Sequence, residues 1–364
     1  MENKCRNRYR CSGKQKIRTA AENVFRTGRY LMAYDLENKL VVGVSSRALF
    51  DLTYENTIFE SDGVEAYCRY QIEHENEILR PGPGFPLIKA LLDLNNLPGR
   101  EESVEVIIMS RNSPDSSLRV FNAIEYYGLK ITRAVLASGA SLAPYLSAFR
   151  TDLFLSAYED DVQSAIDSNI AAGIICTDGL YTYDCDHRIR QIRIAFDGDA
   201  VLFSDESEQI FKEQGLEAFE ENERRNANSP LEAGPFARFL KMLSGLQKDC
   251  TAEEAPIRTA LVTSRCAPTH ERVIRTLRAW NVRIDEVFFL GGICKKDVLR
   301  AFGAHIFFDD QSVHTASASE VVPAARVPYK KKTPCDEDEE EEEDHSRPAH
   351  ALSAALKQQE KKCG

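Results

Sequence analysis

The stretch Ile194-Ala-Phe-Asp-Gly-Asp-Ala-Val-Leu202 joins a short apolar run to a turn that is rich in Asp and Gly. The stretch Val42-Gly-Val-Ser-Ser-Arg-Ala-Leu-Phe50 matches it 152 residues earlier. Four further pairs of blocks match at offsets of 152 to 154: Gly63–Tyr67 with Gly215–Phe219, Gly82–Pro83 with Gly234–Pro235, Val106–Arg111 with Ala260–Arg265, and Leu153–Ser156 with Ile306–Asp309. A nearly constant offset indicates an internal repeat, so we expect one structural unit written twice.

Each copy combines short, strand-like apolar runs with amphipathic helical patterns. The runs are Leu40–Val44, Val106–Met109, Arg133–Ala137 and Asp152–Leu155 in the first copy, and Ile192–Phe196, Ala260–Val262, Glu286–Leu290 and His305–Phe308 in the second. Most of them lack polar alternation, which suits strands buried on both faces. Strands that alternate with helices pair in parallel through right-handed crossovers. The expected class is therefore α/β, a doubly wound sheet in two tandem units, with a helix-rich insert after the first strand of each.

Composition and charge narrow the class of protein. Of the 364 residues, 43% are hydrophobic and 28% are charged, which is typical of a globular protein. The net charge of −11 argues against a general nucleic-acid binder, which carries a basic surplus. Residues 1–30 hold nine Lys or Arg, and residues 336–344 are all acidic. Blocks of like charge cannot form a core, so we expect disordered tails at both ends, with partner binding as the alternative.

The cysteines, histidines and apolar runs bear on three points: zinc binding, the redox compartment and membrane association. Ten cysteines form no CxxC pair and the seven histidines are scattered, so no zinc spacing exists. Reduced thiols of a cytoplasmic protein are the expected state. No apolar run reaches the roughly 18 residues of a membrane helix, so no membrane partner is expected. The sequence leaves the oligomeric state open, and a homo-oligomer is one of the alternatives.

Polar side chains follow each apolar run of the second copy. They are Asp197-Gly-Asp199, Thr263-Ser-Arg265, Lys295-Lys296 and Asp309-Asp310. Each motif alone has a structural interpretation: a turn for the first, a helix N-cap for Thr263, a solvated surface for the lysines. Ligands of open α/β sheets bind at the carboxyl ends of the strands, however, and here all four ends carry reactive groups. Together they predict a phosphoryl-transfer site.

These motifs resemble those of a known superfamily. Asp197-Gly-Asp-Ala-Val201 fits the DxDx[TV] signature of haloacid-dehalogenase-like (HAD-like) phosphohydrolases, and Thr263, Lys295 and Asp309-Asp310 fit its other three motifs in order. Four longer stretches are similar to the cytosolic type I 5′-nucleotidases: Ile194–Glu208, His305–Gln311, Val44–Phe50 and Tyr70–Glu77. The resemblance covers residues 40–329. It implies two tandem Rossmann-like, HAD-like units with a helical cap insert in each.

The resemblance also implies an activity and roles for four side chains. The expected enzyme is a Mg²⁺-dependent 5′-nucleotidase that hydrolyses nucleoside 5′-monophosphates, with AMP favoured. Asp197 would be the nucleophile that forms an aspartyl-phosphate, and Asp199 the general acid and base. Thr263 would bind a phosphoryl oxygen and Lys295 would neutralise its charge. The family spacing selects Lys295, and the adjacent Lys296 remains the alternative.

Further residues are expected around this catalytic set. The metal ligands would be Asp197, Asp199, Asp309 and Asp310, with Asp199 acting through its carbonyl. The substrate phosphate would also meet Gly198, Ser264 and Arg265. A cap at about 204–255 would exclude water and contact the base, with Phe211, Phe219, Phe236 and Phe239 as stacking candidates or core residues. The domain boundaries follow: a tail at 1–38, a degenerate unit at 39–185, a catalytic unit at 186–329 and a tail at 330–364.

The first copy lacks every catalytic group. Ser45, Arg47, Leu142 and Ser156 stand at the positions of the nucleophile, the acid, the lysine and the metal carboxylate. One interpretation is a structural partner for the second copy. The other is a nucleotide-binding cleft without catalysis, because type I cytosolic 5′-nucleotidases are activated by nucleoside diphosphates. An ADP site would use Ser45, Ser46, Arg47, Ser110 and Arg111.

Two rival functions remain at this stage. One is a phosphatase of the same superfamily for another phosphomonoester, such as a sugar or amino-acid phosphate. The other is a nucleotide-binding regulatory protein without turnover. The complete motif set of the second copy argues against the latter, because a site freed from catalysis is expected to lose its carboxylates, as the first copy has.

Overall fold

Ten strands form one sheet in the computed structural model, which describes residues 34–177 and 189–331 apart from residue 249. The tails predicted at 1–38 and 330–364 lie almost wholly outside the described residues. The strands are β1 (Leu40–Val44), β2 (Val104–Ser110), β3 (Arg133–Leu136), β4 (Leu153–Ser156), β5 (Ala171–Ile175), β6 (Ile192–Phe196), β7 (Ile257–Thr263), β8 (Glu286–Phe289), β9 (Ile306–Asp309) and β10 (Ala324–Arg326). The α/β class predicted from the sequence is confirmed.

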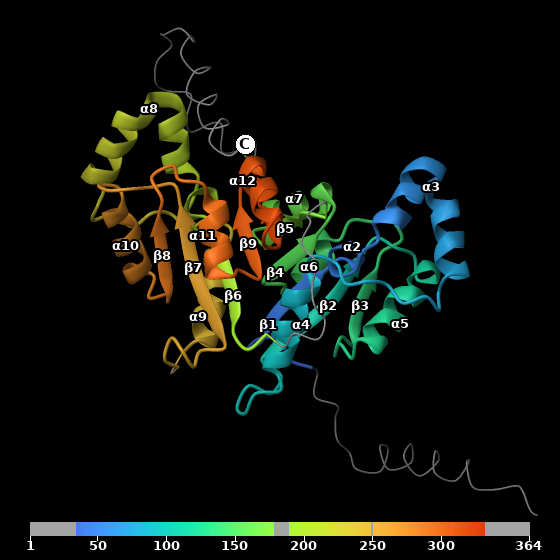
Figure 1. Cartoon of the computed structure of the whole chain (residues 1–364). Coiled ribbons are helices and arrows are strands. Elements are labelled where there is room, and N and C mark those ends of the chain that lie inside the picture. The colour runs from blue at the N-terminus through green and yellow to red at the C-terminus, as the bar shows by residue number, and fades with distance from the viewer. Residues whose placement is uncertain (1–33, 178–188, 249, 332–364) are drawn as a thin grey trace, which may run out of the picture. The chain divides into compact units, whose positions relative to one another are not determined.

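Helices connect the strands within each copy (Figure 1). The first copy has α2 (Ser46–Leu49), α3 (Thr53–Glu73), α4 (Phe85–Leu94), η1 (Asp115–Ser117), α5 (Leu118–Tyr126), α6 (Ala143–Ala148) and α7 (Glu159–Asp167). The second has η2 (Gly198–Leu202), α8 (Glu206–Arg225), α9 (Ala237–Leu246), α10 (His270–Ala279), α11 (Lys295–Phe302) and α12 (Ser312–Ser319). The predicted inserts thus each hold two helices, α3 with α4 and α8 with α9.

The strand order is β3-β2-β1-β4-β5-β10-β9-β6-β7-β8. Neighbouring strands are parallel within each half of this order. The exception is the central seam, where β5 and β10 pair antiparallel, with Ile175 opposite Ala325 and Ile174 opposite Arg326. A Cβ atom added to Gly173 would lie 2.9 Å from the Cβ of Ala325, so this position in β5 has no room for a side chain. The large sheet is therefore mostly parallel, with one antiparallel contact at its centre.

The long helices α3 and α8 share an unusual break. Gly63 in α3 has φ 83° and ψ −178°, and Gly215 in α8 has φ 86° and ψ −177°. A backbone with this positive φ is accessible to glycine but strained for other residues. A glycine at both points is therefore a conformational requirement. The two glycines are 152 residues apart, which is the offset of the repeat. The two inserts thus bend at the same place.

The strand registers correct one of the block alignments. Val42 pairs with Val106, whereas its counterpart Ile194 pairs with Thr259. Val106 therefore corresponds to Thr259, an offset of 153 residues, and the offset of 154 expected for this block was wrong by one. The slip arose because the inner residues of both strands, Val106–Met109 and Ala260–Val262, are all apolar, so they align almost equally well in neighbouring registers.

Aromatic side chains fill the core of the second copy. Phe196 stacks on Phe308 with ring centroids 5.7 Å apart, and Phe236 lies 4.6 Å from Phe308. Phe236 and Phe239 are fully buried in this cluster, so they act as core residues and offer no face for stacking on a base. Each such ring contributes roughly 2–3 kcal/mol by burial. The cluster lies directly behind the ends of β6 and β9, which carry the polar groups described below.

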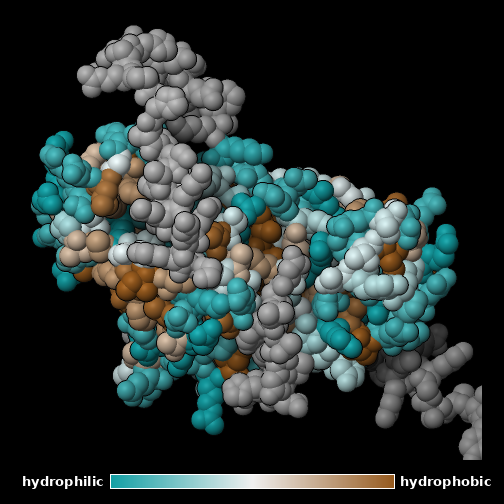
Figure 2. Space-filling view, turned by 45° about the horizontal axis from the view of Figure 1, so that its top comes forward, coloured by the Kyte–Doolittle hydropathy of each residue, from teal (hydrophilic) through white to brown (hydrophobic). Residues whose placement is uncertain are grey.

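The surface of the described part is mixed in character. In the face shown by Figure 2, hydrophobic areas are separated by hydrophilic ones. None of the helices in residues 34–177 and 189–331 is long and apolar enough to cross a membrane. The apolar residues of α9 are largely buried rather than displayed.

Candidate active site

The end of β6 presents Asp197. Its backbone N–H donates to Phe308 O at 2.8 Å, which fixes this residue beside the end of β9. The chain then turns through η2, where Ala200 has φ 61°. A Cβ on Gly198 would lie 3.4 Å from the Thr263 hydroxyl, so the turn passes close to the end of β7. The sequence predicted this gathering of strand ends, and the structure brings Asp197, Gly198 and Thr263 together.

Lys295 lies at the centre of the predicted site. It begins α11 and is buried, and its Nζ donates to Asp197 Oδ1 at 2.7 Å and to Asp309 Oδ2 at 2.6 Å. Lys296 instead pairs with Glu320 at the surface. Of the two adjacent lysines, Lys295 is the one that reaches the carboxylates.

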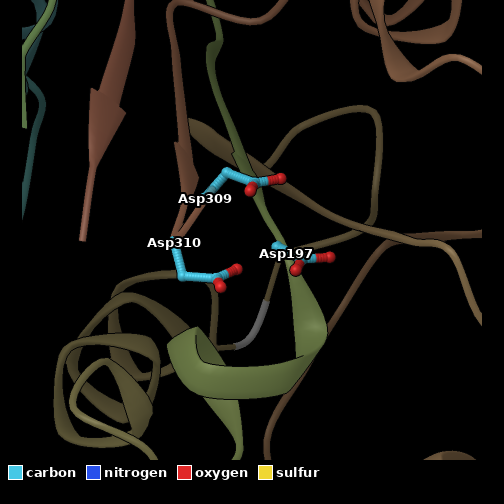
Figure 3. Close-up of side chains that lie close together, drawn as sticks. All are labelled: Asp197, Asp309 and Asp310. Carbon is cyan, nitrogen blue, oxygen red and sulfur yellow. The ribbon is translucent and has the colours of Figure 1, made fainter. Parts of the chain in front are cut away.

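The carboxylates of Asp197, Asp309 and Asp310 lie close together (Figure 3). Asp197, Asp309 and Asp310 each offer one oxygen, and these oxygens all lie within 4.8 Å of one another. All three residues are buried. Asp310 Oδ1 has no hydrogen-bond partner among the described residues, although it is buried. A buried carboxylate oxygen without a donor suits a cation, so these residues fit a divalent metal with oxygen ligands.

Burial and mutual repulsion shift the pKa values of this cluster. Burial raises the pKa of Asp197 to about 7; Lys295 opposes this rise and Asp309 adds to it. Burial likewise raises the pKa of Asp310 to about 9, and the charges of Asp197 and Asp309 add to the rise. For Asp309, burial is outweighed by Lys295 and His314, so its pKa is lowered. The carboxylates repel one another, which is the electrostatic condition that a bound cation would relieve.

The end of β7 supplies hydroxyl groups. Thr263 is buried and its Oγ1 accepts the backbone N–H of Arg265 at 3.2 Å. Ser264 is exposed at the end of the strand. The corrected register makes Ser110 the counterpart of Thr263, and its hydroxyl accepts the N–H of Asn112 in the same way, at 3.1 Å. The first copy therefore keeps a hydroxyl at this point while lacking the carboxylates.

Asp199 and Arg265 form a bidentate ion pair. Arg265 Nε donates to Asp199 Oδ2 at 2.8 Å, and Nη2 donates to Oδ1 at 2.6 Å. The third group, Nη1, donates to Glu223, which comes from α8 and is buried. Burial alone would lower the pKa of Arg265, but the two carboxylates raise it above its ordinary value. Arg265 was expected to bind the substrate phosphate; in this structure its guanidinium is held by Asp199 and Glu223.

Three residues beside the site were not predicted. Glu223 carries no distinguishing sequence signal, because it stands among other charged residues of α8. His314 Nδ1 lies 3.2 Å from Asp309 Oδ2, five residues further along the chain. The Tyr329 hydroxyl donates to Asp310 Oδ2 and also lies 2.8 Å from Glu208 Oε2. Only a search for polar residues just after the last strand could have drawn attention to Tyr329.

The five residues expected to form an effector site lie at the matching strand ends of the first copy. Ser45 caps α2 by accepting the N–H of Ala48, and the Ser46 and Ser110 hydroxyls are 3.2 Å apart. Arg111 pairs with Asp161 at 2.6 Å. The guanidinium of Arg47 lies 5.7 Å from the ring centroid of Tyr158. Its buried Nε has no hydrogen-bond partner in the part of the chain that the structure describes.

The two remaining aromatic candidates lie in α8. Phe211 is 43% exposed and packs edge-on against Phe219, with ring centroids 6.2 Å apart. The guanidinium of Arg265 lies over the Phe219 ring, 5.2 Å from its centroid. Phe219 is therefore close to the ion pair of Asp199, and Phe211 is the more open of the two rings.

Comparison with known proteins identifies the family of the chain. A family model described as 5′-nucleotidase matches residues 32–334. Human cytosolic 5′-nucleotidase 1B is 38% identical over 306 residues, which are 81% of this chain and 50% of that protein. The chain thus spans about half the length of this curated relative, and no solved structure matches it at a significant level. The match over most of the chain shows that the protein belongs to the 5′-nucleotidase family.

Proposed function

We propose that this protein is a Mg²⁺-dependent 5′-nucleotidase that hydrolyses nucleoside 5′-monophosphates, AMP above all, in the cytosol. The observation that carries the proposal is the buried cluster of Asp197, Asp309 and Asp310 around Lys295. A structural ion pair needs one carboxylate, whereas three carboxylates and one ammonium leave an excess of negative charge that a divalent cation would balance. The family and the name of the relative support the nucleotide as substrate.

The first half-reaction would use Asp197 as nucleophile. One carboxylate oxygen of Asp197 forms a bond to phosphorus, and the bond from phosphorus to the ribose 5′-oxygen breaks. The carboxyl of Asp199 gives its proton to that leaving oxygen. Thr263 donates a hydrogen bond to a phosphoryl oxygen, and Lys295 neutralises charge there. In the second half-reaction, water cleaves the aspartyl-phosphate.

The metal would be held by Asp197, Asp309 and Asp310, with the backbone carbonyl of Asp199. When bound, Mg²⁺ would supply positive charge that offsets the carboxylates and the phosphoryl oxygens. Asp310 Oδ1, which has no hydrogen-bond partner among the described residues, supports this set of ligands. Gly198 lies in the turn beside Thr263, and Ser264, which is exposed at the end of β7, would meet the phosphate.

The finer architecture is also part of the proposal. The two copies would be tandem HAD-like units, at 39–185 and 186–329, because both show the strand order 3-2-1-4-5 when numbered within the copy. The insert at about 204–255 would act as the cap, mainly through α8, since α9 packs into the core. Phe211 and Phe219 would then be the residues that meet the base.

The substrate and metal can be tested together. With the full chain and Mg²⁺, phosphate release from AMP should exceed release from sugar phosphates and phosphoserine at equal concentration. EDTA should remove the activity, and added Mg²⁺ should restore it, because the carboxylate cluster needs a cation. Preference for an ester that is not a nucleotide would favour a different phosphatase. Absence of turnover on every ester would favour a nucleotide-binding regulatory protein.

The first copy suggests a second, regulatory role as an ADP site. The support is Arg47, whose buried Nε lacks a partner among the described residues, beside the hydroxyls at the ends of β1 and β2. Arg47→Ala and Arg111→Ala should each remove stimulation by ADP and leave basal turnover of AMP unchanged. Arg69→Ala, at an exposed position of α3, is the control. Stimulation that persists in both variants would show that this copy has a structural role only.

A further inference from the structure

Each copy buries one arginine against its long bent helix. In the first copy, Arg119 of α5 donates to Glu55 Oε1 at 2.6 Å and to Gln71 Oε1 at 3.4 Å, both in α3. The side chains of Arg119 and Glu55 are each 7% exposed. This ion pair is buried, and the second glutamate near Arg119, Glu77, is 3.8 Å away and 65% exposed.

The second copy repeats this contact with its own arginine, Arg272 of α10. Arg272 Nη1 donates to Glu223 Oε1 at 2.8 Å, and the hydroxyl of Ser207 donates to the same oxygen at 2.9 Å. Glu223 and Ser207 both belong to α8. The arginine is therefore retained, again with one buried carboxylate, while the exposed Glu206 lies 3.8 Å away.

The carboxylate has changed places between the copies. At the offset of 152 residues, Ser207 corresponds to Glu55, and Glu223 corresponds to Gln71. Either placement satisfies a buried arginine, so the need to pair Arg272 does not explain why the glutamate stands at position 223. The second oxygen of Glu223 does explain it, because that oxygen accepts a hydrogen bond from Arg265.

Arg265 is itself specific to the second copy. Its counterpart under the corrected register is Asn112, which is uncharged and donates to the Tyr67 hydroxyl at 3.0 Å. The first copy has Arg47 at the position of Asp199, Asn112 at that of Arg265 and Gln71 at that of Glu223. The chain Arg272–Glu223–Arg265–Asp199 therefore occurs only in the copy with the carboxylates of the site.

We propose that Arg265 and Glu223 are positioning residues that hold the Asp199 side chain in place for the water step of the reaction. This inference rests on the function proposed above. The side chains of Arg265 and Glu223 are 2% and 0% exposed, whereas that of Asp199 is 18% exposed. Two buried side chains thus hold a carboxylate that is partly exposed to solvent. It gives Arg265 a role other than phosphate binding.

In the water step, Asp199 takes up the proton that the water loses. A water oxygen forms a bond to the phosphorus of the aspartyl-phosphate, the bond from phosphorus to the Asp197 oxygen breaks, and the water proton passes to the Asp199 carboxylate. The bidentate contact with Arg265 engages both oxygens of Asp199 and so fixes how this side chain faces the water. The ribose oxygen is already held in place by the bound substrate, whereas the incoming water depends on Asp199 for its position. Loss of the support should therefore slow dephosphorylation more than phosphorylation of Asp197.

The test places residues of the first copy at the corresponding positions of the second copy. The double variant Ser207→Glu/Glu223→Gln keeps a carboxylate for Arg272 and withdraws it from Arg265. With AMP as substrate, kcat should fall about tenfold because one charge-assisted hydrogen bond is lost. The value of kcat/KM should stay close to that of the wild type. The fraction of acid-trapped phosphoprotein in the steady state should rise.

A triple variant covers the outcome in which the double variant is unstable. Adding Arg265→Asn reproduces Glu55, Gln71 and Asn112 of the first copy and leaves no arginine unpaired. Its kcat should fall about 10²-fold, the cost of a misplaced catalytic group. The mirrored variant Glu55→Ser/Gln71→Glu makes the same exchange in the first copy and should leave kcat unchanged.

The results distinguish a failure of the proposed function from a failure of the positioning role. If the wild-type chain releases no phosphate from AMP or other nucleoside monophosphates, the proposed function is wrong. If the wild type is active but kcat and kcat/KM fall together in the double and triple variants, with no rise in phosphoprotein, the positioning role is wrong. An unchanged kcat in the triple variant would also overturn it.

Discussion

Asp197→Asn should reduce the hydrolysis of AMP on the order of 10⁴-fold or more, because an amide cannot replace the attacking carboxylate oxygen. The amide keeps the shape of the side chain, and Asp309 still pairs with Lys295, so the fold should survive. Steady-state phosphate release and trapping of the phosphoprotein in acid are the two measurements. Both signals should be lost together.

The matched control is Asp51→Asn, at an exposed acid that follows the corresponding turn of the first copy. It should retain the wild-type rate. If Asp197→Asn kept substantial activity, or still formed an acid-stable phosphoprotein, the covalent mechanism through Asp197 would be refuted.

Lys295→Met should damage both stability and activity. It leaves Asp197 and Asp309 facing each other in a buried site without their shared cation. Removing one partner of a buried ion pair costs about 3–5 kcal/mol, so the melting temperature should drop clearly. Loss of charge neutralisation at the phosphoryl group should lower kcat about 10²–10³-fold.

Lys296→Met provides the comparison at the neighbouring position. Lys296 pairs with Glu320, whose side chain is 52% exposed, so its loss should cost at most about 1 kcal/mol and leave kcat nearly unchanged. Mg²⁺ should raise the melting temperature of Lys295→Met more than that of Lys296→Met, because a cation can replace part of the missing charge. Equal effects of the two substitutions would contradict the assignment of Lys295.

The strand ends of the second copy could be predicted because their signal is local. Asp197, Thr263, Lys295 and Asp309 each follow an apolar run, and the topology of a parallel sheet then brings such ends together. The repeat was visible for the same reason, since the turns and glycines that bound the strands keep their spacing. The choice between Lys295 and Lys296 needed the helix geometry, because one residue turns the side chain by about 100°.

The strands of the central seam could not be predicted in this way. β5 contains Ala171, Ala172 and Gly173, and β10 is only three residues long, so neither has a marked β-propensity. Glu223 was missed because its role depends on a side chain 42 residues away. Contacts of that kind are set by how α8 packs, and a single sequence carries no sign of them.

The antiparallel seam has a consequence for the origin of the architecture. Phe154 pairs with Ala172, and its counterpart Phe307 pairs with Ala324, so Ala172 corresponds to Ala324 and Ile174 to Arg326. Ile174 is also the residue that lies opposite Arg326, so the seam joins a strand to its own equivalent. Such self-complementary pairing defines an isologous contact, the kind that relates two subunits by a two-fold axis. The polypeptide thus has the geometry of a homodimer fused into one chain, in which only one protomer has kept its carboxylates.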